Sequence, residues 1–157
     1  MKLNCDGSFL PSSLEGSWGY LIQDCDGDVI VSGRGKIECL LNTFQAELID
    51  CLQGIQAVVD LGIGWLIVET NTKMVIQALN TNDYEKTAVG VLIAEIKSLV
   101  SSSFISFECS FKSRDCNKAA HELAVLGYLC NPREEQVMSS IPESVYVIVA
   151  NDLLAVE

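Results

Sequence analysis

The sequence predicts a mixed α/β fold in which a single sheet is covered by helices. Three strand-like segments come first, and the apolar period then changes to that of an amphipathic helix. A strongly apolar segment follows that helix, and two helical regions, another strand and a last helix come after it. This order of elements is typical of a sheet with helical layers. The 157 residues are enough for one domain with a substantial core.

The N-terminal part is predicted to form three strands and one helix. The strands are expected at residues 2–9, 18–24 and 29–35. Between the last two, DCDGD predicts a tight hairpin, because a misplaced glycine and a missing closing glutamate do not suit a calcium-binding loop. From Asn42 to about Leu61 apolar residues recur every three or four positions, and Asn42 forms a plausible capping pair with Gln45.

The second half predicts one buried strand and then alternating helices and a strand. Residues 65–70, WLIVET, are apolar and branched, which predicts a buried strand, parallel to a neighbour, after a helical crossover. The later elements are two helices, a strand and a last helix, expected at 72–80, 87–100, 104–112 and 115–129 respectively.

The last residues form a separate tail in this interpretation. We expect a domain at 1–130 and a tail at 131–157 that packs on the domain or forms an interface. The branched residues of VYVIVA favour a strand, but a short helix packed on the body fits the pattern equally well.

Composition limits the compartment and the partners. No apolar run approaches the roughly 18 residues of a membrane span, and MKLNCDGS at the start has no apolar signal region. We therefore expect an intracellular protein, cytoplasmic or nuclear, that is not secreted and has no membrane partner. The hydrophobic content of 49% indicates a large core or a protein interface.

Charge and cysteine content argue against two kinds of site. The net charge of −11 argues against tight nonspecific nucleic-acid binding, since such proteins usually carry a basic stripe. The seven cysteines are scattered and odd in number, which favours small buried hydrophobes in a reducing compartment. A zinc site of Cys116, His121 and two remote partners is disfavoured by the spacing.

Acidic residues fall on separate predicted elements. Asp6 lies in the first strand, Glu47 lies in the first helix, and the fourth strand ends at position 71. A two-metal phosphodiesterase needs carboxylates from different elements to meet at one end of a sheet, where a pair of ions activates water and stabilises the leaving oxygen. Scattered acids alone are a weak signal, because most of them only solvate a surface.

Three motifs together are more specific. NCDGSF, the stretch from QAELIDC to NTKMVIQAL, and RDCNKAAHELA resemble the RNase H type-1 domain over about residues 2–127. The resemblance is strongest to the plant reverse-transcriptase-like branch, which is found alone and in retroelements. It implies a five-stranded mixed sheet with the first three strands antiparallel, flanked by helices. It also implies cleavage of the RNA strand in RNA–DNA hybrids with Mg²⁺, or with Mn²⁺ in its place.

The resemblance assigns roles to individual residues. Asp6 matches the aspartate shared by both metals, and Glu47 matches the helix glutamate that holds the nucleophile-side metal. Asn71 and His121 stand where the catalytic enzymes have the third and the fourth acid. Asn117 matches the asparagine that begins the last motif.

The two departures weaken the implied site. Asn71 could still offer an amide oxygen to a metal, but it removes a full negative charge from a site that must gather two dications. His121 could shuttle a proton to the leaving oxygen, or it could only pack or cap near the last helix. Glu69 lies two residues before Asn71 on the same face of the strand and could partly compensate.

Substrate contacts are expected beside the acids. Gly7 and Ser8 would let the backbone approach a phosphate or a 2′-hydroxyl, or they only shape the end of the strand. Asn117 is the other implied contact. Three aromatic residues are expected in the core or on a sheet face rather than as stacking platforms, namely Trp18, Tyr20 and Trp65.

Three functions follow from these observations. The first is a weak metal-dependent nuclease that acts on RNA–DNA hybrids or RNA through Asp6 and Glu47. The second is an inactive RNase H-like module that binds a protein through an apolar surface or the tail. The third, a noncatalytic nucleic-acid binder, is disfavoured by the charge. We expect catalysis to be reduced or absent.

Overall fold

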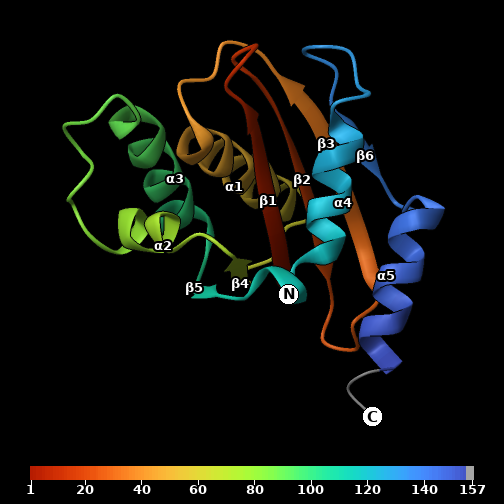
Figure 1. Cartoon of the computed structure of the whole chain (residues 1–157). Helices are drawn as coiled ribbons and strands as arrows, with labels where there is room; N and C mark the ends of the chain where they lie inside the picture. The colour runs from red at the N-terminus through yellow and green to blue at the C-terminus, as the bar shows by residue number, and fades with distance from the viewer. Residues whose placement is uncertain (155–157) are drawn as a thin grey trace.

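The computed structural model describes residues 1–154, which form a six-stranded sheet with helices on both faces (Figure 1). The strands are β1 (Lys2–Leu10), β2 (Glu15–Gln23), β3 (Val29–Ile37), β4 (Trp65–Thr70), β5 (Ser106–Phe111) and β6 (Gln136–Met138). The helices are α1 (Thr43–Asp60), α2 (Lys73–Asn80), α3 (Gly90–Ser103), the short 3₁₀ helix η1 (Arg114–Cys116), α4 (Lys118–Gly127) and α5 (Glu143–Leu154). None of the helices in this part of the chain is long and apolar enough to cross a membrane.

The sheet confirms the expected mixed topology and adds a strand. Its order is β5-β4-β1-β2-β3-β6. Strands β1, β2 and β3 pair antiparallel, whereas β4 pairs parallel with both β1 and β5. All five strands implied by the resemblance are present, and β6 extends the sheet by pairing antiparallel with β3.

The tail contains a strand, β6, and a helix, α5. The VYVIVA run lies in α5, although its branched residues favour a strand. Val145 and Val149 are four residues apart and are buried in a cluster with Leu21 and Leu123. Tertiary packing of this face outweighs the weak helix propensity of branched residues.

Two helical layers enclose two clusters of buried residues. The larger cluster lies between the sheet and α1, α2 and α3, and it includes Leu3 of β1, Val68 of β4 and Leu48 of α1. The smaller cluster lies under α4 and α5 on the opposite face. Figure 1 shows α4 in front of the sheet and α1 behind it. The sheet is therefore the central layer, and its side chains pack against helices on both faces.

The prediction for β4 was half wrong. The strand is parallel, as expected, but it is buried on one face only: Leu66 and Val68 are buried, whereas Trp65 is 60% and Ile67 is 45% exposed. The reason is that α4 packs on β1, β2 and β3, and in the described part of the chain no helix lies over β4 and β5 on that face. Of the three expected core or sheet-face aromatics, Trp18 and Tyr20 are buried and stacked on each other.

The local signals at the hairpin and at the first helix are confirmed. The backbone N–H of Asp24 donates to the carbonyl of Asp28, and Gly27 has a φ of 86°, which closes the turn between β2 and β3. At the start of α1, the side chain of Asn42 accepts a hydrogen bond of 2.9 Å from the N–H of Gln45.

Gly7 determines how closely α1 approaches β1. A Cβ atom at this position would lie 2.6 Å from the backbone carbonyl carbon of Ala46 and from the backbone nitrogen of Glu47. Such a distance is far shorter than ordinary van der Waals contact, so only glycine permits this approach. The contact places Glu47 directly beside the strand that carries Asp6.

Candidate active site

The sheet and two helices bring the four predicted catalytic positions together. Cys5 of β1 pairs with Thr70, the last residue of β4. The next residues of the two segments, Asp6 and Asn71, therefore lie side by side. Glu47 lies near the start of α1, and His121 lies in the first turn of α4 on the other side of the sheet. Asp6 and Glu47 are buried, with 3% and 6% of their surface exposed.

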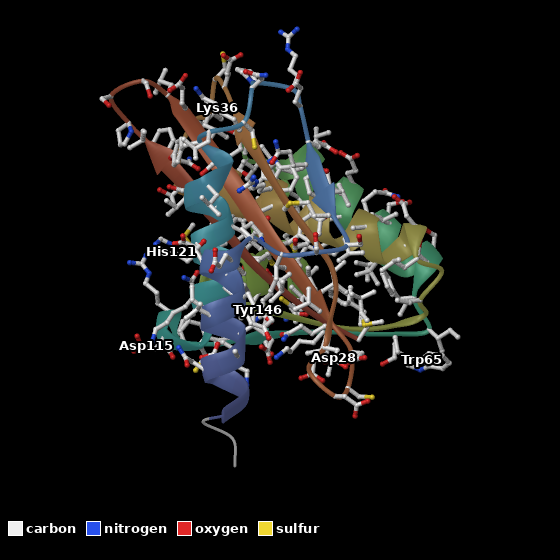
Figure 2. All side chains as sticks on the ribbon, turned by 90° about the vertical axis from the view of Figure 1, so that its right-hand side faces the viewer. Asp28, Lys36, Trp65, Asp115, His121 and Tyr146 are labelled. Atoms are coloured by element: carbon white, nitrogen blue, oxygen red, sulfur yellow. The ribbon has the colours of Figure 1, made fainter. Side chains whose placement is uncertain are left out.

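Both carboxylate oxygens of Asp6 are engaged by neighbouring side chains. Oδ1 accepts a hydrogen bond of 3.2 Å from the amide Nδ2 of Asn71. Oδ2 lies 2.7 Å from Nδ1 of His121, which is the geometry of a short charge-assisted hydrogen bond. In Figure 2 the labelled His121 lies on α4 at one side of the molecule, where 45% of its side chain is exposed. The side chains at positions 71 and 121 thus both present donor groups to Asp6.

Asn71 turns its oxygen away from Asp6. The amide Oδ1 accepts a hydrogen bond of 3.2 Å from the hydroxyl of Thr72, while the Nδ2 group faces Asp6. A metal ion bound at Asp6 would therefore meet amide hydrogens at this position. This arrangement is the reverse of what a cation site needs.

Glu47 is held close to β1 in a poorly solvated position. Its Oε2 accepts a hydrogen bond of 3.0 Å from the backbone N–H of Gly7. Burial, and then the negative charge of Asp6, raise the pKa of Glu47 to about 7, while the Gly7 N–H, the Thr72 hydroxyl and the Arg114 guanidinium act in the opposite direction. A metal ion that bound Glu47 near neutral pH would therefore have to displace a proton from it.

Asp50 is a buried acid that the sequence interpretation missed. It lies three residues after Glu47, so both acids project from one side of α1. The side chain is fully buried, and neither oxygen has a hydrogen-bond partner among the described residues. Burial, followed by the charges of Glu47 and Asp6, raises the pKa of Asp50 well above its usual value. The three-residue spacing was the only available signal.

Two further side chains near the site were not singled out from sequence. Arg114 of η1 was noted only as part of a modest basic cluster, yet its charge is near enough to lower the pKa of Glu47. Tyr128, just after α4, places its hydroxyl 3.0 Å from the hydroxyl of Ser8. The predicted substrate contact Ser8 therefore has a hydrogen-bond partner on the α4 side of the sheet.

Asn117 and Glu69 have structural partners in this arrangement. The amide of Asn117 donates to the carbonyl of Cys5 at 2.8 Å and accepts from Asn4 at 3.3 Å, which fixes the start of α4 against β1. Glu69 accepts from Asn4 at 3.0 Å and lies 3.9 Å and 3.6 Å from two ammonium groups, those of Lys2 and Lys112. These partners engage both carboxylate oxygens of Glu69.

The residues present do not fit a pair of Mg²⁺ ions. Within residues 1–154, no group of three or more His, Cys, Asp or Glu side chains is arranged to hold a metal ion. Asp6 is engaged on both oxygens, Asn71 presents a donor, and the pKa of Glu47 is raised. A two-metal site needs several ionised oxygen ligands that face one space.

Comparison with known proteins places the chain in a family. A family model described as "Reverse transcriptase-like" matches residues 4–127. A search of curated proteins gave no match. Among solved structures, RNase H1 from the halophilic archaeon Halobacterium salinarum aligns with a TM-score of 0.72 and 19% identity, covering 81% of this chain and 96% of that one.

Two other structures have the same fold. The N-terminal RNase H domain of a Mycobacterium tuberculosis protein gives a TM-score of 0.74 with 20% identity, over 80% of this chain and 91% of that one. LC11-RNase H1, solved with an RNA/DNA hybrid, gives 0.71 with 16% identity, over 79% and 93%. These likenesses establish the fold, and the family model covers most of the chain. The chain belongs to the reverse transcriptase-like family and has the fold of type 1 RNases H.

Proposed function

We propose that this chain is an RNase H-like domain in which two-metal cleavage of RNA in RNA–DNA hybrids is weak or absent. The observation that carries the proposal is the engagement of Asp6, whose two oxygens are bonded to Asn71 and His121. In the two-metal arrangement implied by the resemblance, this carboxylate would lie between both ions. In this structure Asn71 and His121 instead contact the two carboxylate oxygens of Asp6.

The expected loss of rate follows from charge. Replacing a carboxylate by an amide at position 71 removes a full negative charge, and Coulomb attraction is the main term that gathers hard dications. Losing a few kcal/mol of metal or transition-state stabilisation would slow cleavage by roughly 10²–10⁴-fold, since each ~1.4 kcal/mol is a factor of ten. Engagement of Asp6 adds to this loss, because its two hydrogen bonds must break before an ion binds.

The test is cleavage of a labelled RNA–DNA hybrid in Mg²⁺ and in Mn²⁺. Wild type, Asn71→Asp, Asp6→Asn and the double variant Asn71→Asp with His121→Asp are compared side by side. Asn80→Asp is the matched control, because it makes the same substitution at an exposed position of α2. Circular dichroism confirms that each variant is folded.

The proposal predicts little or no cleavage by wild type and by Asn80→Asp. It predicts a gain of at least tenfold in the double variant, in which two carboxylates replace the two donors. Cleavage by wild type at the rate of the double variant, abolished by Asp6→Asn, would mean that the site tolerates neutral ligands and that the proposal is wrong.

A second candidate function is a protein-interaction module, and one observation favours it. The chain exposes large apolar side chains on the open face of β4, Trp65 and Ile67, and on α5, Tyr146 and Val147. Figure 2 shows Tyr146 and Trp65 in different parts of the molecule, so they belong to separate surfaces. A domain that no longer cleaves could act through such surfaces.

A further inference from the structure

A cavity of about 200 Å³ lies between the second half of α1 and the strands β3 and β6, and none of the four matched residues of the candidate active site lines it. Figure 1 shows β6 beside β3, with α1 behind the sheet. Apolar walls come from Val31 of β3, Ala57 of α1 and Val137 of β6. Pockets for drug-sized ligands measure roughly 300–1,000 Å³, so this cavity suits a smaller molecule.

Tyr20 of β2 places a buried hydroxyl at this cavity. Its side chain lines the cavity and is only 1% exposed. Tyr20 pairs with Gly33 of β3, which in turn pairs with Val137 of β6. A Cβ atom at Gly33 would lie 2.5 Å from the Tyr20 hydroxyl oxygen, so the ring lies across β3 in the space that a glycine leaves. The hydroxyl therefore points from β2 toward β6.

The Tyr20 hydroxyl is not used by the fold. Burial, followed by the charges of Asp50, Glu135 and Asp60, raises the pKa of Tyr20 well above its usual value, and no hydrogen bond from the described residues contributes. A buried tyrosine hydroxyl usually has a hydrogen-bond partner. This one is therefore available to a ligand in the cavity.

Two carboxylates flank the hydroxyl. Asp60 is the last residue of α1, and Glu135 directly precedes β6. Oδ1 of Asp60 accepts a hydrogen bond of 2.9 Å from Gln56, whereas no residue within 1–154 bonds to its Oδ2 or to the carboxylate of Glu135. The last turn of α1 contains no basic residue, and the end of a helix carries a partial negative charge. The cavity therefore favours a cation.

We propose that this cavity binds a primary ammonium group at the end of a short alkyl chain, with the Tyr20 hydroxyl, Asp60 and Glu135 as acceptors. A primary ammonium has three N–H donors and no acceptor, which matches three oxygen groups from three separate segments. The hydroxyl accepts one N–H and can donate its own hydrogen to a carboxylate. The alkyl chain lies between the apolar walls.

The domain and the tail build this site together. Tyr20 and Asp60 lie within residues 4–127, which the family model matches, whereas Glu135 and Val137 follow that part. The pairing of β6 with β3 holds the two halves in place, and the guanidinium Nε of Arg34 donates a hydrogen bond of 2.8 Å to the side chain of Gln136. The site therefore depends on residues outside the matched part of the chain.

Titration of isotope-labelled protein with butylamine, followed by the chemical shifts of the backbone amides, tests the proposal. Saturable shifts should appear at residues 57–61 and 135–137, which line or adjoin the cavity. Butanol has the same chain without the charge, and tetramethylammonium has the charge without an N–H donor. Both should bind at least tenfold more weakly. These comparisons use wild type, so they do not depend on the folding of a variant.

A first variant removes only the hydroxyl. Tyr20→Phe should weaken binding of butylamine about threefold or more, because one hydrogen bond to a charged group is lost. Tyr146→Phe is the matched control at a tyrosine that is 63% exposed on α5, and it should bind like wild type.

A second variant removes the two charges. The double variant Asp60→Asn with Glu135→Gln should weaken binding at least tenfold. Its control is Glu85→Gln with Glu95→Gln, which removes two negative charges at exposed positions. This control separates the local acceptors from the general attraction of an acidic protein for cations.

Three results would overturn the proposal: no saturable shifts around the cavity, equal affinity for butylamine and for either comparison compound, or wild-type affinity in both variants. Diaminobutane and the amide of acetyl-lysine distinguish two sources of the ammonium group. Tighter binding of the first supports a free diamine, and tighter binding of the second supports a lysine side chain. Cleavage is not measured in these experiments, so they are independent of the proposed function.

Discussion

Asp6 lies where β1, α4 and the end of β4 meet, and its carboxylate is shared between Asn71 and His121. The two substitutions therefore act together, since each neutral or basic side chain supplies a donor where the resemblance implies an acid. A buried carboxylate without ions needs such partners, because an uncompensated charge is costly in a poorly solvated position. Asn71 and His121 thus stabilise the buried carboxylate of Asp6.

Asp50 provides a residue-scale prediction. Asp50→Ala should raise the free energy of unfolding near pH 7 by about 1–3 kcal/mol, because it removes a buried polar group that has no hydrogen-bond partner. Chemical denaturation of wild type and variant measures the difference. Glu95→Ala is the control for loss of an exposed acid and should change stability by less than about 0.5 kcal/mol. A loss of stability in Asp50→Ala would show that Asp50 has a partner in solution.

The same substitution has a predicted pH dependence. The folded chain raises the pKa of Asp50 above its usual value of 3.8, so above that pH the unfolded chain binds fewer protons and stability falls as pH rises. Glu47, with a pKa of about 7, contributes a fall of the same sign up to neutral pH. The gain from Asp50→Ala should therefore be smaller near pH 4 than near pH 7.

At the scale of elements, the contact between α1 and β1 positions the acids. Gly7→Ala should destabilise the fold by about 1–3 kcal/mol or more, because its Cβ would lie 2.6 Å from the backbone of Ala46 and Glu47. Thermal unfolding measures the loss. Gly62→Ala is a useful comparison, since a Cβ there meets no atom within 4 Å and only its φ of 72° opposes it. Equal losses at both positions would argue against a tight helix–strand contact.

Elements with a strong local signal were predictable. The apolar period and the Asn42 cap predicted α1 to within a residue or two, alternation predicted β1, and two strand-like runs on either side of a turn predicted β2 and β3. The open face of β4 was not predictable, because the exposure of Trp65 depends on how far α4 extends across the sheet. The conformation of VYVIVA likewise depends on the cluster that buries Val145 and Val149.

The four matched residues of the candidate site were predictable, but their hydrogen bonds were not. The resemblance assigned Asp6, Glu47, Asn71 and His121 to one site, and the topology places them close together. Whether the amide of Asn71 offers its oxygen or its hydrogens is decided by Thr72 and Asp6, which lie at different places in the chain. Such choices arise only when the tertiary contacts are known.

At the scale of the whole molecule, the net charge of −11 argues against nonspecific nucleic-acid binding, and the engaged Asp6 argues against binding of a metal ion. An acidic surface would attract Mg²⁺ ions diffusely, but specific binding needs ligands that converge. The fold retains the frame of an RNase H, while the open face of β4 and β5 offers a second, independent surface. The central claim is that Asp6 is not free to bind a metal ion.

Calorimetric titration with Mg²⁺ tests this claim most directly. Wild type and the double variant Asn71→Asp with His121→Asp are compared at the same ionic strength, with Asn80→Asp as the control for added surface charge. We predict no saturable binding by wild type or the control, and saturable binding by the double variant. Saturable binding of Mg²⁺ by wild type that disappears in Asp6→Asn would contradict the account.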